Sequence, residues 1–123
     1  MSKAVLVVDD EPDVLLLARV ILEPAGYRVV EAPNGAAALN VLAEDPPDVL
    51  LLDVRMPGLD GWEVLDRLGA DTLRDLPVVM FSAHAELVSE ERALQAGCRG
   101  YLRKPFSPKA LLQAVATAAS AAA

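Results

Sequence analysis

Short apolar stretches alternate with longer segments of mixed polarity along the whole chain. The stretches are rich in Val and Leu and are apolar at consecutive positions, which is typical of strands buried on both faces of a parallel sheet. They predict strands over residues 4–9, 28–32, 49–53, 78–82 and 99–103. The regular alternation of strands and longer segments predicts an α/β fold with a mainly parallel sheet.

The segments between the predicted strands carry helix signals. The first helix follows Asp10, has Pro12 in its first turn, and carries an expected buried stripe of Val14, Leu17, Ala18 and Ile21. The second begins at the N-cap Asn34 and ends before the prolines at 46 and 47, and the third covers about 60–68. The fourth covers about 86–96 and stops at Gly97, and the fifth opens with Ser107 as N-cap and Pro108. The alanine-rich residues after Val115 are either the end of this last helix or the start of a linker.

Composition narrows the class of protein. The chain has 123 residues, of which 54% are hydrophobic and 24% charged, as in one ordinary globular domain. No apolar run approaches the roughly 18 residues of a membrane span, and the N-terminus lacks a signal-peptide layout, so we expect no membrane insertion. A formal charge of −7 argues against direct electrostatic binding of nucleic acid. Cys98 is the only cysteine, which excludes an internal disulfide and favours a cytoplasmic location; we interpret it as a small, half-buried core residue.

Acidic side chains stand where two of the predicted strands end. Asp9 and Asp10 follow the first strand, and Asp53 closes the third. The carboxyl ends of parallel strands form the ligand crevice of such sheets, so these carboxylates would meet there and repel one another. Mg²⁺ is the expected counter-ion, because it prefers oxygen ligands. Asp53 alone could cap a turn and Asp10 could cap the first helix, but one cap does not explain the adjacent pair.

Two further polar residues end neighbouring strands. Lys104 and Pro105 follow the fifth strand, and Ser82 ends the fourth. Alone, each is an ordinary exposed lysine or strand-end hydroxyl. Together with the acids they outline a phosphoryl site, in which an ammonium and a hydroxyl contact phosphoryl oxygens and Asp53 acts as nucleophile to form an aspartyl phosphate.

Four motifs in order along the chain resemble those of one family. They are VLVVDDEP, LLDVRMPGLDG, VVMFSAH and GYLRKPF. The chain resembles, over essentially its whole length, the receiver domains of bacterial two-component response regulators, the CheY-like family. The resemblance implies one receiver domain over residues 1–123. It also implies a flavodoxin-like (βα)5 three-layer sandwich whose parallel sheet has the strand order 2-1-3-4-5.

The resemblance also implies roles for the acidic residues. Asp53 corresponds to the aspartate that takes a phosphoryl group from a phosphohistidine of a sensor histidine kinase or phosphotransfer protein. Asp9, Asp10 and Asp53, with the backbone carbonyl of Arg55, correspond to the Mg²⁺ ligands. The domain is then a phosphoacceptor in signal transduction and no enzyme beyond its own phosphorylation and dephosphorylation.

The remaining roles concern the phosphoryl group and the switch. Lys104 corresponds to the lysine that pairs with the phosphoryl group, and the resemblance suggests a cis bond from it to Pro105. Ser82 and Tyr101 correspond to the switch hydroxyl and the switch aromatic, and Ala83 to a small residue that leaves the site open. Their movement would reshape the surface of the fourth helix, fifth strand and fifth helix, where a downstream protein binds. Two variable positions, Arg55 and His84, are expected to modulate the hydrolysis rate; His84 is more easily understood as a rim residue.

Other functions fit the sequence less well. A haloacid-dehalogenase-type phosphatase usually has a second aspartate two residues after its nucleophile, where this chain has Arg55. A flavodoxin-like cofactor binder would need a Ser/Thr/Gly-rich loop after the first strand, and DDEP has the opposite charge. A degenerate receiver that only binds partners is disfavoured because the residues for phosphorylation are all present. Arg99 and Gly100 replace the acidic residues expected in winged-helix transcription factors, which argues against that branch.

Overall fold

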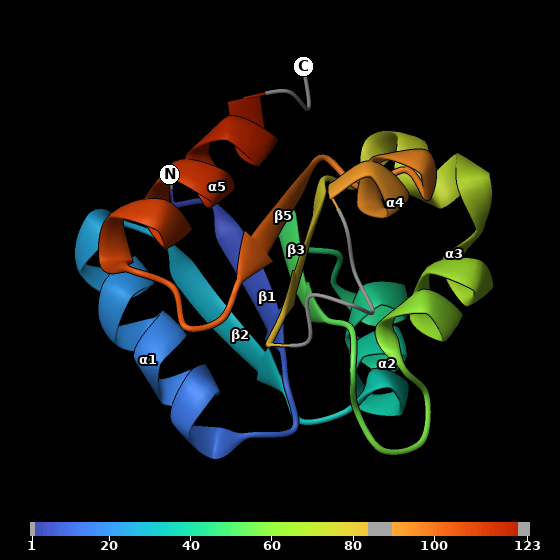
Figure 1. Cartoon of the computed structure of the whole chain (residues 1–123), viewed down its shortest axis with the longest axis horizontal. Coiled ribbons are helices and arrows are strands. Elements are labelled where there is room, and N and C mark those ends of the chain that lie inside the picture. The colour runs from blue at the N-terminus through green and yellow to red at the C-terminus, as the bar shows by residue number, and fades with distance from the viewer. Residues whose placement is uncertain (1, 84–89, 121–123) are drawn as a thin grey trace.

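Five strands alternate with five α-helices in a computed structural model, which describes residues 2–83 and 90–120 (Figure 1). All pairings between neighbouring strands are parallel, and the strand order is β2-β1-β3-β4-β5. This is the flavodoxin-like order expected from the sequence. The elements are β1 (Ala4–Val8), α1 (Pro12–Leu22), a 3-10 turn (Glu23–Ala25), β2 (Arg28–Ala32), α2 (Gly35–Glu44), β3 (Val49–Asp53), α3 (Gly61–Asp75), β4 (Val78–Ser82), α4 (Glu90–Gln95), β5 (Gly100–Arg103) and α5 (Pro108–Ser120).

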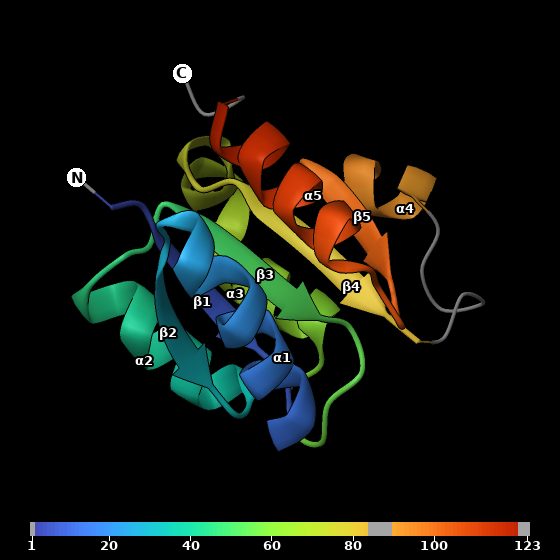
Figure 2. The ribbon, with the colours of Figure 1, turned by 90° about the vertical axis from the view of Figure 1, so that its left-hand side faces the viewer.

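Helices cover both faces of the sheet, which makes three layers (Figures 1 and 2). Helices α1 and α5 lie against one face, and α2, α3 and α4 lie against the other. Alternate residues of each central strand point to opposite faces, so Leu50 and Leu52 belong to one core cluster and Val49 and Leu51 to the other. All five residues of β1, β3 and β4 are buried, which explains why these strands read as continuous apolar runs.

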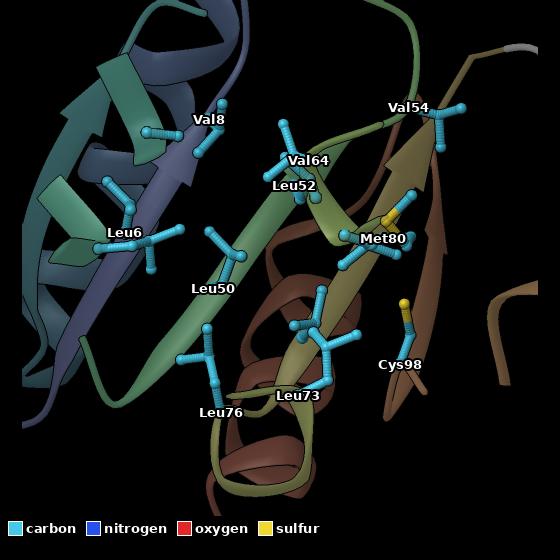
Figure 3. Close-up of a cluster of buried hydrophobic side chains, with 14 of the residues drawn as sticks. Leu6, Val8, Leu50, Leu52, Val54, Val64, Leu73, Leu76, Met80 and Cys98 are labelled. Atoms are coloured by element: carbon cyan, nitrogen blue, oxygen red, sulfur yellow. The ribbon is translucent and has the colours of Figure 1, made fainter. Parts of the chain in front are cut away.

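The cluster beneath α2, α3 and α4 supports the strand ends that carry the acidic residues. Leu6 and Val8 of β1, Leu52 of β3 and Val64 of α3 all belong to this cluster (Figure 3). Full burial of one such side chain contributes about 1.5–3 kcal/mol relative to its exposure. The tightly packed cluster therefore fixes β1 and β3 side by side up to their last residues.

The strand predictions are correct to within one residue, but two helix predictions are wrong in part. In α1, Leu15 and Leu22 are buried, whereas Leu17, which was expected in the buried stripe, is 43% exposed. The residues around Leu17 are almost all apolar, so the sequence does not reveal which side of the helix faces the core. Helix α3 was expected to end at residue 68, but it continues to Asp75 across a non-helical residue, Gly69, with φ 80°. Burial of Leu73 beyond the break explains why the helix resumes.

The ends of the other helices agree with the sequence where the structure describes them. Asn34 caps α2 by accepting a hydrogen bond from the Ala37 N–H at 2.8 Å, and Ser107 Oγ accepts one from Ala110 N–H at 3.1 Å. The predicted start of α4 lies outside the described residues. Helix α5 continues to Ser120, so the alanine-rich segment is helical at least that far.

None of the helices in the described ranges has the length and apolar character required to span a membrane.

Candidate functional site

Three carboxylates meet at the carboxyl end of the sheet, as the sequence predicted. Asp9 and Asp10 follow β1, Asp53 is the last residue of the adjacent β3, and one carboxylate oxygen from each lies within 4.8 Å of the others. Asp9 and Asp53 are buried, with 0% and 3% exposure, whereas Asp10 is exposed. Their side chains extend from neighbouring strands whose register the core fixes, so their proximity is a direct consequence of the fold.

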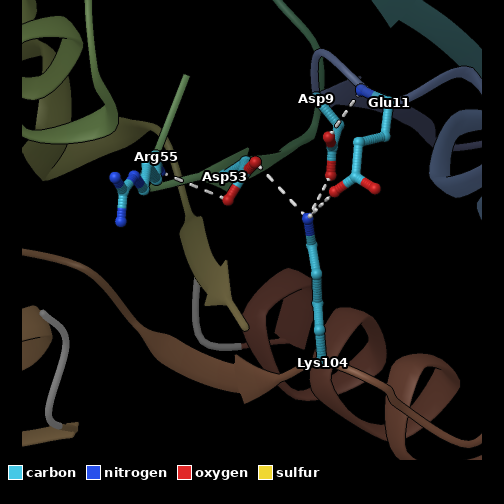
Figure 4. Close-up of polar contacts among 5 residues, drawn as sticks. All are labelled: Asp9, Glu11, Asp53, Arg55 and Lys104. Carbon is cyan, nitrogen blue, oxygen red and sulfur yellow. Dashed lines mark hydrogen bonds and ion pairs between the residues drawn. The ribbon is translucent and has the colours of Figure 1, made fainter. Parts of the chain in front are cut away.

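Lys104 reaches this cluster from the end of β5 (Figure 4). Its Nζ lies 2.7 Å from Asp9 Oδ2, 3.4 Å from Asp53 Oδ2 and 3.4 Å from Glu11 Oε1. The ammonium also lies 5.0 Å from the centre of the Phe81 ring. The bond from Lys104 to Pro105 is cis, as expected. The ammonium is therefore a counter-ion shared among three acidic side chains.

Burial and mutual repulsion change the protonation of the buried groups. Burial, and then the charge of Asp9, raise the pKa of Asp53 to about 7 against the opposing effect of Lys104. Burial also raises the pKa of Asp9, although Lys104 and the Glu11 N–H stabilise its charged form. Burial lowers the pKa of Lys104, but Asp9, Asp53 and Glu11 together outweigh this effect, so its pKa is raised. One ammonium thus compensates only part of the negative charge in the cluster.

The loop after Asp53 forms one wall of the site. A crevice of about 430 Å³ is lined by three acidic residues, by Ala83 and Lys104, and by the loop. The acidic residues are Asp10, Glu11 and Asp53, and the loop residues are Arg55, Met56 and Pro57. The Arg55 N–H lies 3.4 Å from Asp53 Oδ1, and its exposed side chain extends away from the carboxylates (Figure 4). At the end of the loop, the Gly61 N–H donates to the Val54 carbonyl at 2.7 Å. The backbone of Arg55 is thereby held at the edge of the crevice.

The residues expected to form the switch lie on β4 and β5. Ser82 is fully buried at the end of β4, the strand next to β3, and the exposed Ala83 lines the crevice. Tyr101 on β5 is half-buried and packs against the cluster beneath α2, α3 and α4. His84 lies outside the described residues.

From the sequence alone we interpret Glu11 as a solvated acid in the first turn of a helix, where the helix dipole favours it. Its side chain is 62% exposed, but it also belongs to the site. Its carboxylate contacts Lys104, and its backbone N–H donates to Asp9 Oδ1 at 2.9 Å. Its position directly after the acidic pair was the one available signal. The contact itself depends on how far Lys104 reaches, which the sequence does not reveal.

The donor atoms suit a hard divalent cation. The three carboxylates offer only oxygen ligands, two of them are buried, and their charge is not fully compensated by Lys104. Mg²⁺ prefers such ligands and retains several waters, for which the open crevice has room. The arrangement can therefore hold a cation beside a carboxylate nucleophile and present an ammonium to an incoming anionic group.

Comparisons with known proteins find relatives that cover most of this chain. The family model described as "Response regulator receiver domain" matches residues 5–116. The phosphate regulon transcriptional regulatory protein PhoB of Pseudomonas aeruginosa is 39% identical over 113 residues, which cover 91% of this chain and 49% of that protein. The transcriptional regulatory protein KdpE of Mycobacterium tuberculosis is 42% identical over 102 residues, covering 83% of this chain and 44% of that protein. The chain thus spans about half the length of these curated relatives.

Solved structures share the fold over the whole chain. A putative response regulator from Chloroflexus aurantiacus has a TM-score of 0.88 and 32% identity, and the match covers 98% of this chain and 99% of that one. The chemotaxis response regulator CheY4 of Vibrio cholerae has a TM-score of 0.85 and 28% identity, with coverage of 96% and 99%.

Proposed function

The chain belongs to the receiver domain family of two-component response regulators, and we propose that Asp53 is its phosphoacceptor. Receiver domains are signalling domains of phosphorelays, which makes an aspartate-nucleophile phosphatase or a flavin-type cofactor binder a poor alternative. One observation carries the proposal: Asp53 ends β3 inside the crevice, with two other carboxylates and the ammonium of Lys104 around it. We take residues 1–123 as one such domain.

The proposed reaction is the transfer of a phosphoryl group from a histidine of a kinase or phosphotransfer protein. An oxygen of the Asp53 carboxylate attacks phosphorus, the new O–P bond forms as the N–P bond breaks, and the imidazole leaves and takes up a proton. Lys104, already 3.4 Å from Asp53 Oδ2, is placed to pair with the phosphoryl oxygens. Attack of water on the same phosphorus returns the carboxylate and releases phosphate, so the domain also reverses its own modification.

Mg²⁺ is the proposed cofactor, held by Asp9, Asp10 and Asp53 with the backbone carbonyl of Arg55. When bound, it would neutralise the carboxylates and stabilise charge on the phosphoryl oxygens. Arg55 and His84 are proposed to influence the hydrolysis rate, Arg55 from the rim of the crevice.

The phosphoryl group would then act as a ligand that favours one of two conformations. Ser82, buried at the end of the strand beside that of Asp53, would donate a hydrogen bond to a phosphoryl oxygen. The small side chain of Ala83 leaves room for the phosphoryl group to approach. Tyr101, half-buried on β5, would turn further inward. The altered surface of α4, β5 and α5 would bind the downstream protein.

The partners and setting of the complete protein are also proposals. The chain covers about half of its curated relatives but almost all of the two solved response regulators. PhoB and KdpE are named as transcriptional regulators. The sequence-based expectation against winged-helix output stays a prediction. We propose a cytoplasmic domain that does not itself bind nucleic acid or insert into a membrane.

The proposal is tested by incubating the protein with acetyl phosphate and Mg²⁺ and measuring its intact mass. We expect the mass of one phosphoryl group to be added, and we expect no addition to Asp53→Asn or to wild type in excess EDTA. Equal labelling of wild type and Asp53→Asn would refute the assignment of Asp53.

A further inference from the structure

The loop of residues 54–60, hereafter the β3–α3 loop, separates two hollows. On one side, its residues 55–57 line the crevice that holds Asp53 and Lys104. On the other side, its residues 57–59 line a second hollow of about 470 Å³, together with residues 33–36 at the start of α2. Asp10 and Pro57 belong to the linings of both. The start of α2 therefore supports the loop from the side opposite to the crevice.

Gly35, the first residue of α2, is in direct contact with this loop. A Cβ atom at Gly35 would lie 2.8 Å from Leu59 Cβ, 3.0 Å from the Leu59 carbonyl oxygen and 2.9 Å from Val64 Cγ2. Two of these atoms belong to the backbone or lie next to it, so they cannot give way by rotation of a side chain. Gly35 is not among the glycines with positive φ, so its backbone conformation suits other residues. The close approach to Leu59 of the loop and to Val64 of α3 requires glycine here.

The far end of the loop is held in the same manner. A Cβ atom at Gly61 would lie 2.6 Å from the Asp53 carbonyl oxygen and 2.9 Å from Val54 Cα. The Gly61 N–H also donates to the Val54 carbonyl. The loop is thus fixed against β3 at its end and against α2 at Leu59, and the crevice-lining residues stand between β3 and Leu59.

We infer that Gly35 is a positioning residue for the metal site: its missing side chain lets α2 hold the β3–α3 loop, and with it the backbone of Arg55, at the edge of the crevice. The inference rests on the proposed function, because it takes the Arg55 carbonyl as a ligand of Mg²⁺. Gly35 would thereby connect the metal site with α2, a helix that contributes no side chain to the cluster of Asp9, Asp10 and Asp53. Displacing the loop at Leu59 would move the Arg55 carbonyl, which is the one proposed metal ligand outside the three carboxylates.

The test compares Mg²⁺ affinity, measured by isothermal titration calorimetry, in wild type, Gly35→Ala and Leu42→Ala. Leu42 is a buried residue of α2 that does not line either hollow, so its truncation destabilises the same helix without pushing the loop. We expect Gly35→Ala to weaken Mg²⁺ binding at least about tenfold and to shift the amide resonances of Arg55 and Met56. Leu42→Ala should lower the melting temperature yet keep Mg²⁺ affinity within about twofold of wild type.

A rescue variant keeps the test decisive if Gly35→Ala does not fold. In the double variant Leu59→Gly/Val64→Ala both side-chain atoms that an added methyl group would meet are absent, so adding Gly35→Ala to it should change Mg²⁺ affinity by less than about threefold. Wild-type affinity in Gly35→Ala, or a tenfold loss that persists in the Leu59→Gly/Val64→Ala background, would overturn the inference. A wild-type protein that neither binds Mg²⁺ nor accepts a phosphoryl group from acetyl phosphate would instead refute the proposed function.

Discussion

Lys104 lies closer to Asp9 than to Asp53: its Nζ is 2.7 Å from Asp9 Oδ2 and 3.4 Å from Asp53 Oδ2. The sequence suggested that Lys104 pairs with a phosphoryl group on Asp53. Asp9 is fully buried and is also a proposed metal ligand. The ammonium and a bound divalent cation would therefore share a carboxylate, and the charge of each would affect the binding of the other.

Replacing Lys104 should affect metal binding and phosphoryl transfer in opposite directions. In Lys104→Met we expect Mg²⁺ to bind about tenfold more tightly, because a cation in direct contact with Asp9 is removed. We expect phosphorylation by acetyl phosphate at saturating Mg²⁺ to slow by about tenfold or more, because the ammonium no longer pairs with the phosphoryl oxygens. Calorimetry and intact-mass kinetics measure the two effects.

The neighbouring Arg103 provides the control for Lys104→Met. It is exposed and carries the same charge, so Arg103→Gln should change Mg²⁺ affinity by less than about threefold. Unchanged or weaker Mg²⁺ binding in Lys104→Met would contradict the shared-carboxylate arrangement.

The raised pKa of Asp53 predicts a pH dependence of stability in the metal-free protein. Its value of about 7, against 3.8 for a free aspartate, means that the folded state retains a proton which the unfolded state releases. This contribution is fully present below about pH 4 and is lost as the pH rises through about 7. At one pKa unit per 1.36 kcal/mol it amounts to at most about 4 kcal/mol.

Asp53→Asn should remove this dependence. In EDTA at pH 8 we expect the variant to be about 1–3 kcal/mol more stable than wild type, because repulsion between buried carboxylates is relieved. At pH 4 the two proteins should be nearly equal in stability. Urea unfolding at both pH values measures the difference, and a variant several kcal/mol less stable at pH 8 would show that the carboxylates form a satisfied network.

Ser82 should be needed for the conformational change that follows phosphorylation, but not for the phosphorylation of Asp53 itself. Ser82→Ala keeps the nucleophile, the proposed metal ligands and Lys104, so we expect Asp53 to be phosphorylated within about threefold of the wild-type extent. The amide shifts that beryllofluoride induces across Gly100–Arg103 and Glu90–Gln95 should be strongly reduced, because the hydroxyl no longer contacts the phosphoryl group. Equal shifts in both proteins would make the hydroxyl a bystander.

The sheet and the acidic cluster were predictable from the sequence for one physical reason. Strands buried on both faces must be continuously apolar, so each strand end is marked by the first polar residue, as at Asp9, Asp53 and Ser82. Parallel strands then bring these ends to one edge of the sheet. The predicted proximity of the carboxylates needed no knowledge of side-chain conformation.

Features that depend on how a helix packs or how far a side chain extends could not be predicted from the sequence. The buried face of α1 was misplaced because apolar residues occupy successive positions, so that Leu15 and Leu17 fit the pattern equally well. The continuation of α3 past Gly69 depends on a core position for Leu73. The contact from Glu11 to Lys104 joins residues far apart in the chain and is set by side-chain geometry alone.

The most direct test of the central claim locates the phosphoryl group chemically. After treatment with acetyl phosphate and Mg²⁺, reduction with borohydride converts an aspartyl phosphate to homoserine, which peptide mass spectrometry assigns to one residue. The account predicts homoserine at position 53 alone, and none in wild type that was not exposed to acetyl phosphate. Homoserine at Asp9 or Asp10, or a phosphorylated protein without any homoserine, would contradict it.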